Sequence, residues 1–288
     1  MYEKFCLNLL SEKEADVVIF GVLLGRNSKE MLNSLRKTSW FVEWFDIDEG
    51  KNLVEKAKVA DIGNVKAEKI EDTFKKILEE GKIPFMISSS HLSTYFALKS
   101  FSKEVKVVSF DAHFDLKNNY FDEEMVESVY PLKLSKTEVK KLNRATWARR
   151  SFEETKRDFC FIGVRSGDEF ELEFVKSNNF LYFTPKLIRE KFQEVEEKIE
   201  NFCKNSKIYL SLDMDVFDPS IAPAVCYPEP DGIFWSQFQK LLKKIFTGKV
   251  VGLDLVEIKP ARENKITEFL AVKAIFKCLF LLTKLKVI

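Results

Sequence analysis

A chain of 288 residues with 45% apolar residues, including 27 Phe, is large enough to bury a sizeable core. Charged residues make up 32% but nearly cancel to a net charge of +1, which argues against a surface dedicated to nucleic acid or membranes. Five scattered cysteines without a CxxC pair predict neither a disulfide framework nor a thiolate zinc site. The N-terminus is charged and no apolar run reaches about 18 residues, so we expect a cytoplasmic chain without a membrane segment.

Six apolar runs predict buried β-strands, and amphipathic or apolar stretches between them predict helices. In 67–81, for example, Ile70, Phe74 and Ile77 recur at helical spacing. The segment 116–150 is rich in charges and has no strand pattern, so we expect it to pass over the functional site. The expected elements, in chain order, are strand 16–21, helices 28–37 and 67–81, strands 83–88, 105–110 and 159–164, helix 185–205, strands 207–212 and 249–253, and helix 267–285.

The near-continuous apolar character of these strands is typical of parallel strands that are covered on both faces. Strands alternating with helices predict a doubly wound α/β fold, whose ligands bind at the carboxyl ends of the strands. No internal repeat, low-complexity segment or Gly/Ser/Pro-rich linker divides the chain. We therefore expect a single domain over residues 1–288.

Acidic and imidazole side chains follow four of the predicted strands, and both histidines of the chain are among them. Because parallel strands end at one edge of a sheet, we expect these groups to converge. They are His91 after strand 83–88, Asp111, His113 and Asp115 after 105–110, Asp213, Asp215 and Asp218 after 207–212, and Asp254 and Glu257 after 249–253.

Carboxylates packed this closely resist ionisation unless a cation neutralises them. In the DxHxD and DxD spacings, alternate residues of an extended segment point the same way, so the ligands can share a face. Nitrogen and oxygen ligands without thiolates suit a hard or borderline divalent ion such as Mn²⁺, and the set is large enough for two ions. A single DAH or DMD sequence is more typical of a turn, a helix cap or a solvated strand end. Together, at equivalent strand ends, these sequences predict a metal site.

The same segments resemble the metal-binding motifs of the ureohydrolase family, which includes arginase, agmatinase and formiminoglutamase. In the family's order they are HLS after IPFMISS, SFDAHFD, SLDMDVFDPSIAP and GLDLVEIKP, of which the SxDxDxxDPxxAP element from Ser211 to Pro223 is the most specific. The resemblance covers the chain from about residue 14 to the C-terminus. It implies a three-layer αβα sandwich with a mostly parallel central sheet, two Mn²⁺ ions per subunit and a homo-oligomer, either a trimer or a hexamer.

The resemblance also implies roles for individual residues. Asp115 would receive a proton from the attacking water and so be catalytic as well as a ligand, and Glu257 would orient the substrate by pairing with its guanidinium group. Asp168, in a segment that resembles the family's GxRxxD element, is a candidate for binding the substrate's distal amine, with Glu171 assisting. The alternative is that Asp168 begins a surface helix, whose first turn favours acidic residues. The metal ligands implied by the resemblance are His91, Asp111, His113, Asp115, Asp213 and Asp215.

The implied activity is hydrolysis of the C–N bond of a linear amidine, with a small guanidino amine as substrate and neither nucleic acid nor membrane as partner. Agmatine is the leading candidate, because the SLDMDVFDPSIAP and PEPDG segments look more like those of agmatinase than of arginase. Its hydrolysis gives urea and putrescine, a step of polyamine biosynthesis.

The chain departs from the family pattern at four places. Serines at 88–90 replace a GGD sequence, bulkier side chains replace several of the family's glycines within 222–232, and 21–25 lacks a further polar group. Most consequentially, Arg144 in NRATW stands where the family carries a histidine thought to shuttle protons. An arginine stays protonated, and general acid–base assistance contributes about 10²–10⁴-fold in rate.

Three alternatives follow from this replacement: a slower ureohydrolase, a hydrolase of another linear amide or amidine, and a catalytically impaired metal-binding relative. An amide hydrolase of the deacetylase type is similar in fold. It would hold one metal and would need a histidine pair, for which this chain has no spare histidines.

Overall fold

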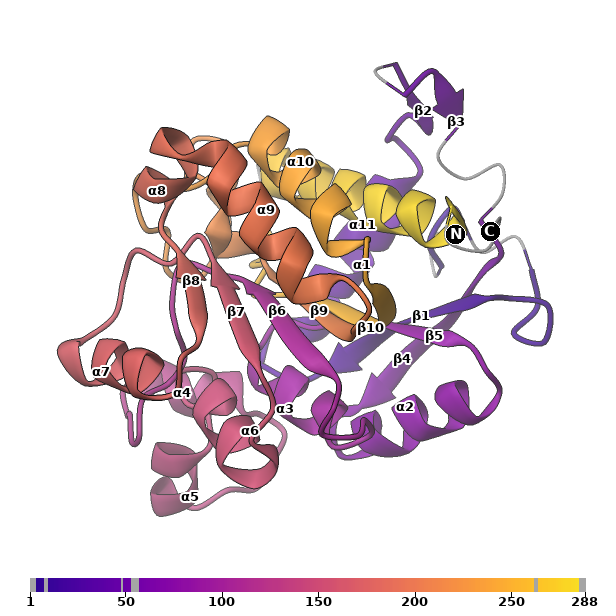
Figure 1. The fold of residues 1–288 in the computed structure, drawn as a ribbon. Helices are drawn as coiled ribbons and strands as arrows, with labels where there is room; N and C mark the ends of the chain where they lie inside the picture. The colour runs from indigo at the N-terminus through magenta and orange to yellow at the C-terminus, as the bar shows by residue number, and fades with distance from the viewer. Residues whose placement is uncertain (1–3, 8–9, 48, 53–56, 262–263, 285–288) are drawn as a thin grey trace.

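The computed structural model describes residues 4–7, 10–47, 49–52, 57–261 and 264–284. Its centre is an eight-stranded sheet in which all neighbouring strands are parallel (Figure 1). A separate antiparallel ribbon joins β2 (Phe45–Asp46) to β3 (Lys51–Asn52). In spatial order the strands of the large sheet are β4 (Val59–Lys66), β1 (Val17–Leu23), β5 (Ile83–Ile87), β10 (Lys249–Val256), β9 (Lys207–Asp213), β6 (Lys106–Phe110), β7 (Phe159–Ile162) and β8 (Leu181–Phe183).

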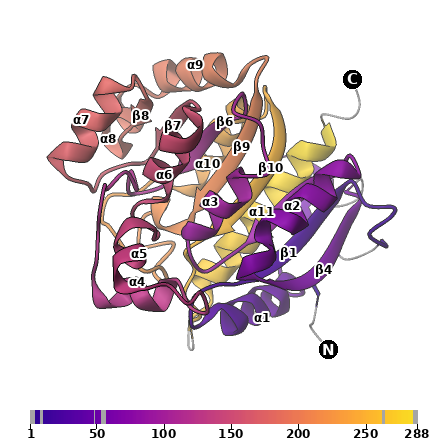
Figure 2. The ribbon, with the colours of Figure 1, turned by 90° about the horizontal axis from the view of Figure 1, so that it is seen from below.

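Helices cover both faces of this sheet. On the upper face in Figure 1 lie α1 (Ser28–Ser39), α8 (Pro185–Glu190), α9 (Phe192–Cys203), α10 (Trp235–Ile245) and α11 (Ile266–Lys284). Below the sheet lie α2 (Ile70–Glu79), α3 (Leu92–Leu98), α4 (Glu123–Ser128), α5 (Lys136–Lys141) and α6 (Trp147–Thr155). Figure 2, from below, shows α2, α3 and α6 across the sheet and α4 and α5 off to one side, whereas α7 (Glu169–Ser177) lies near β7 and β8.

The period of two in each strand divides the core between these layers. In β1, Val17 and Ile19 pack in the core that contains α1, α9, α10 and α11, whereas Val18 and Phe20 pack in the core that contains α2, α3 and α6. The expected three-layer αβα fold around a parallel sheet is confirmed.

The six strands predicted from the sequence hold the six interior positions of the sheet, and the two that were missed, β4 and β8, are its edges. Only the first three residues of β4 are buried, and β8 has three residues in all. An edge strand has one neighbour and a partly solvated surface, so it lacks the continuous apolar run that identifies an interior strand. Helix 185–205 was predicted as one element but divides at Lys191, whose φ of −135° and ψ of 44° are not helical.

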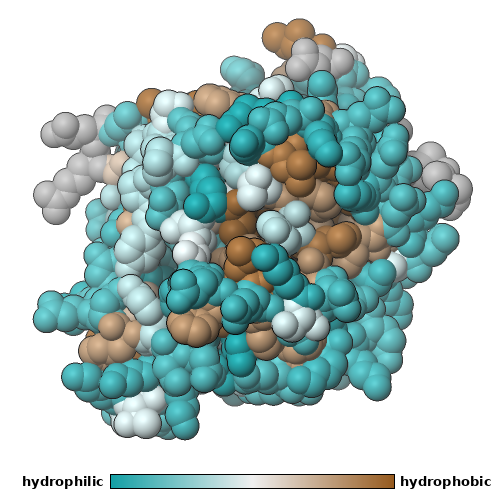
Figure 3. Space-filling view, turned by 60° about the vertical axis from the view of Figure 1, so that its left-hand side comes forward, coloured by the Kyte–Doolittle hydropathy of each residue, from teal (hydrophilic) through white to brown (hydrophobic). Residues whose placement is uncertain are grey.

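The segment 116–150 forms no strand and contains α4, α5 and the start of α6. No helix in the described part of the chain combines the length and apolar character needed to cross a membrane. The face seen in Figure 3 is mostly hydrophilic, with apolar side chains gathered in and around a central hollow.

Candidate active site

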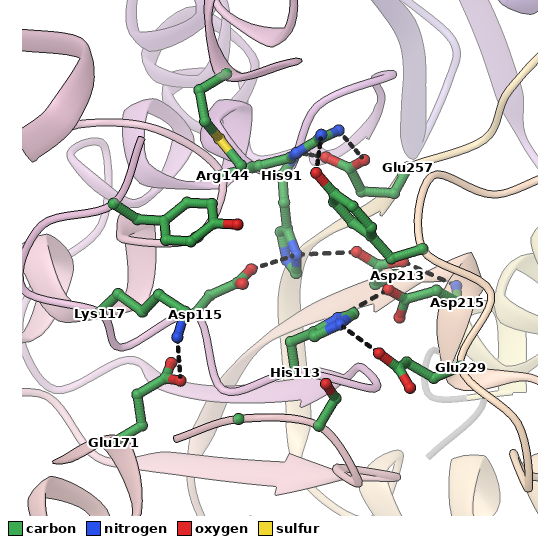
Figure 4. A pocket seen from close by; sticks show the side chains of 16 residues that line it. His91, His113, Asp115, Lys117, Arg144, Glu171, Asp213, Asp215, Glu229 and Glu257 are labelled. Carbon is green, nitrogen blue, oxygen red and sulfur yellow. Dashed lines mark hydrogen bonds and ion pairs between the residues drawn. The ribbon is translucent and has the colours of Figure 1, made fainter. Parts of the chain in front are cut away.

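The order of strands in the sheet creates the site. β9 and β10 come late in the chain but lie between β5 and β6, so the carboxyl ends of these four strands are adjacent. They bring His91, Asp213 and Glu257 together with the DxHxD segment that follows β6 (Figure 4). All six predicted ligands lie in this cluster, and each lies within 3.5 Å of another member.

The geometry around His91 fits a metal ion. Its Nδ1 lies 3.2 Å from one Oδ2 atom of each of three carboxylates, those of Asp111, Asp115 and Asp213. The histidine is buried, yet this nitrogen makes no well-directed hydrogen bond to the described residues. Three acidic oxygens around one unpaired ring nitrogen form a donor set that a divalent cation can fill.

A second group shares Asp111 with the first. The Nδ1 of His113 lies 3.0 Å from Oδ2 of Asp215 and 3.5 Å from Oδ1 of Asp111, whose other oxygen faces His91. The ligand atoms of His91, Asp111 and Asp213, and those of Asp111, His113 and Asp215, lie within 4.8 Å of one another in each group. Two groups that share one carboxylate, with one of its oxygens in each group, suit two neighbouring ions.

Electrostatics point the same way. Burial raises the pKa of the Asp213 carboxyl well above its usual value, and the charges of Asp215 and Asp111 raise it further. Burial also raises the pKa of Asp115, to about 7, with Asp111 adding to the effect. Burial opposes a charge on His113, but Asp111 and Asp215 outweigh it and raise its pKa to about 12. The carboxylates of the ligand cluster thus favour the binding of positive charge. In the metal-free protein, protons supply this charge.

A cavity of about 260 Å³ opens beside the ligands. Five of the six predicted ligands line it, while Asp111 lies behind them. The charge-rich segment 116–150 forms part of the wall, as expected, through residues that include Lys117, Tyr120 and Met125. Sequence reasoning missed Lys117, Tyr227 and Glu229 as lining residues, although Glu229 belongs to the PEPDG segment it had singled out.

Glu257 lies on the cavity wall next to the ligands. Its Oε1 accepts a hydrogen bond of 2.7 Å from the backbone N–H of His91. Its backbone has a φ of +62°, and Asp115 has a φ of +53°. Residues other than glycine rarely adopt this left-handed region, and they are held there only when the surrounding structure enforces it. Both carboxylates are therefore fixed in place by the fold.

The remaining predicted residues are less central. Asp168 is the N-cap of α7, where it forms a capping box with Glu171, and it is not among the residues that line the cavity. Glu171 does line it and accepts a hydrogen bond from the Leu116 N–H. Asp218, which we expected at the same edge, instead caps a turn through Ser220 and lies apart from the ligand cluster.

The sequence profile of the arginase family matches residues 27–281. The chain belongs to the arginase family. The ureohydrolase resemblance of its motifs is thereby confirmed, and the two ligand groups agree with the dinuclear metal site that arginase-family enzymes generally hold.

Several relatives extend over most of this arginase-family chain. A 32.2 kDa protein of Methanothermus fervidus, itself uncharacterized, is 30% identical over 85% of this chain and 82% of its own length. The N(1)-aminopropylagmatine ureohydrolase of Thermococcus kodakarensis is 26% identical over 84% of this chain and 80% of its own length. Among solved structures, the agmatine ureohydrolase of Thermoplasma volcanium has a TM-score of 0.82 at 25% identity, covering 99% of this chain and 95% of that one.

A buried hydrogen-bond chain orients His91 in this arginase-family site. Its Nε2 lies 2.9 Å from the hydroxyl of Ser211, which donates to Asp254 at 2.7 Å. Thr94 and Tyr209 also donate to Asp254. Because Ser211 gives its proton to Asp254, the ring nitrogen is the donor to Ser211, and Nδ1 is left free for a metal. Asp254 therefore supports the site from behind and is not among the residues that line the cavity.

Ser211→Ala should weaken Mn²⁺ binding by roughly 10–100-fold, the usual effect of losing a group that orients a ligand. Calorimetric titration of metal-free protein with Mn²⁺ measures it. Ser109→Ala is a matched control, because Ser109 is paired with Ser211 on the adjacent strand and its buried hydroxyl has no hydrogen-bond partner among the described residues. Equal affinities in the two variants would contradict the orienting role.

Proposed function

We propose that this arginase-family protein is a dinuclear Mn²⁺ hydrolase that cleaves a guanidino amine to urea and an amine, with agmatine as the leading candidate. One observation carries the proposal: the carboxylates that surround the unpaired Nδ1 of His91 adjoin a second ligand group, at the end of a cavity of about 260 Å³. The donor atoms are nitrogen and oxygen only, which favours Mn²⁺ over softer ions.

The proposed ligands are His91, Asp111, His113, Asp115, Asp213 and Asp215. Two ions bound there would lower the pKa of a water molecule and orient it as a nucleophile towards the planar guanidinium carbon. Asp115 is the proposed acceptor of the proton that such a water loses, because its carboxylate lines the cavity with Oδ2 3.2 Å from Nδ1 of His91. The indole N–H of Trp147 donates to its Oδ2 at 2.7 Å and fixes its orientation.

The two ends of a guanidino amine would need separate acidic partners. Glu257, next to the ligands, is the proposed partner of the guanidinium group. Asp168 and Glu171 are proposed for the distal amine, and they already bind the ammonium of Lys117, with Nζ 2.6 Å from Oδ2 of Asp168 and 3.2 Å from Oε2 of Glu171. A substrate amine could take the place of this flexible side chain.

Urea release measures the proposed activity. Metal-free protein loaded with Mn²⁺ would be tested with agmatine, arginine, guanidinobutyrate and formiminoglutamate, with ammonia or formamide release recorded for the last. Release from agmatine would support the proposal, and hydrolysis of formiminoglutamate alone would move the assignment to another amidine. No product from any of these compounds at saturating Mn²⁺ would reject a ureohydrolase activity. Metal bound at two ions per chain without turnover would then favour an impaired metal-binding relative.

A further inference from the structure

Arg144 places a guanidinium group of the protein itself on Glu257. Its Nη1 lies 3.3 Å from Oε2 of Glu257 and donates at 2.9 Å to the Sγ of Cys226. Its Nη2 donates to Oε2 of Glu124 and to the hydroxyl of Tyr227, both at 3.0 Å. Figure 4 shows the guanidinium end of Arg144 at Glu257, beside His91.

Glu257 is prepared for this partner independently of Arg144. Its Oε1 is held by the backbone of His91, and its left-handed backbone fixes the direction of the side chain. The other oxygen faces the cavity and binds a planar guanidinium at the wall next to the metal ligands. The subsite at Glu257 therefore suits a guanidinium group, and in this structure that group belongs to Arg144.

The fit of Arg144 is incomplete. Its Nε is buried without a hydrogen-bond partner among the described residues. A buried donor that stays unpaired costs about 1–3 kcal/mol. The guanidinium therefore forms its ion pair with Glu257 in a position where Nε finds no acceptor among the described residues.

A second cavity adjoins the Arg144 side chain and offers space for another position of its guanidinium group. Arg144 lines both the ligand cavity and this second cavity of about 210 Å³. The second cavity is also lined by Gly25, Ser89, Glu127 and Cys226. Glu124 lies on the wall of this second cavity and is already bonded to Nη2. A small rotation of the side chain could keep the ion pair with Glu124 while it releases Glu257.

We infer that Arg144 is an internal occupant of the guanidinium subsite at Glu257, so that a guanidino ligand binds only when it displaces Arg144 towards the second cavity. The inference rests on the proposed function in so far as Glu257 is taken as the partner of the substrate guanidinium. An occupant that fills the subsite nine times in ten lowers the apparent affinity for a competing ligand about tenfold. Arg144 therefore sets how much affinity a substrate must gain elsewhere in the cavity.

The test uses guanidinium chloride at low, non-denaturing concentration as the ligand and metal-free full-length protein. Titration calorimetry would measure the affinity for guanidinium, and the melting temperature would measure the stabilisation it gives. Both would be compared with KCl at the same concentration. Arg144→Ala should bind guanidinium at least about tenfold more tightly than the unmodified chain, because no internal competitor remains. The gain should disappear in the double variant with Glu257→Gln, which removes the charge of the subsite.

Lys259→Ala is the matched control, since it removes a cation from the wall of the second cavity but leaves Arg144 on Glu257. It should show no gain in guanidinium affinity. If Arg144→Ala does not fold, Arg144→Met keeps the length and apolar stem of the side chain without the guanidinium and is judged in the same way. Unchanged affinity in a folded Arg144 variant, or a gain that survives Glu257→Gln, would overturn the inference.

This outcome is independent of turnover. Guanidinium binding that depends on Arg144 and Glu257 would support the inference even if no substrate in the panel is hydrolysed. Conversely, urea release from agmatine with no effect of Arg144→Ala on guanidinium binding or on KM would leave the proposed function standing and the inference wrong. If both hold, KM for agmatine should fall at least about tenfold in Arg144→Ala.

Discussion

Asp111→Asn should abolish stoichiometric Mn²⁺ binding and lower the rate of amidine hydrolysis by on the order of 10³-fold or more. Asp111 is the carboxylate common to both ligand groups, with one oxygen facing His91 and the other facing His113. An amide at this position supplies one weaker oxygen donor and no charge. Losing several kcal/mol of metal-derived stabilisation of the transition state corresponds to about this factor in rate. Metal content by elemental analysis and initial rates at saturating Mn²⁺ measure the two effects.

Two further substitutions make this result specific. Asp215→Asn removes a carboxylate that belongs to the His113 group only, so one ion should remain bound near His91. Asp218→Asn changes an acidic residue of the same sequence motif that caps a turn, and it should leave both ions and the rate unchanged. If Asp111→Asn still bound two ions, the sharing of Asp111 between the groups would be wrong.

Loading with Mn²⁺ should raise the melting temperature by on the order of 10 °C. In the metal-free protein the carboxylates of Asp111, Asp213 and Asp215 are buried close together, and their mutual charge raises the pKa of Asp213 beyond the effect of burial. A ligand present at about a thousand times its dissociation constant stabilises the folded state by about 4 kcal/mol. For a chain of this size each kcal/mol shifts the melting temperature by roughly 2–4 °C. Calorimetric melting with and without the metal gives the shift.

Asp111→Asn provides the reference for this measurement as well. Its melting temperature should hardly respond to Mn²⁺, while that of Asp218→Asn should rise as in the unmodified chain. A comparable rise in all three proteins would mean that Mn²⁺ stabilises the fold somewhere other than the proposed site.

The relation between sequence and fold depends on where a strand lies in the sheet. The interior strands are covered by helices on both faces, so nearly all of their residues are apolar, as in VVSF and IYLSL. Such apolar runs can be recognised in the sequence. The edge strands β4 and β8 are held by one neighbour each. Their residues meet solvent on one side, so local hydrophobicity does not distinguish them from a loop. The break between α8 and α9 is equally invisible, because the apolar spacing continues across Lys191.

The sequence by itself determined the fold class and the set of candidate ligands. The reason is physical: parallel strands end at a common edge, so acidic and imidazole residues that follow buried strands lie along that edge. The DxHxD and DxD segments are not extended as expected, because Asp115 has a φ of +53° and Asp215 lies in the 3₁₀ helix η2 (Met214–Val216). The candidate ligands thus follow from local pattern and sheet geometry, whereas the adjacency of β5, β10, β9 and β6 brings them together.

Only the tertiary structure decided what Arg144 contacts. In the sequence it stands where the resemblance to the family places a histidine, which predicts a missing proton shuttle and nothing about its contacts. Folding brings it to Glu257, 113 residues further along the chain, and to Glu124, Cys226 and Tyr227 on other segments. Contacts between loops depend on side-chain lengths and on the exact course of the backbone, which no periodicity encodes. The candidate metal ligands could be predicted because strands bring them to one edge of the sheet, whereas the contact of Arg144 with Glu257 could be found only in the assembled cavity.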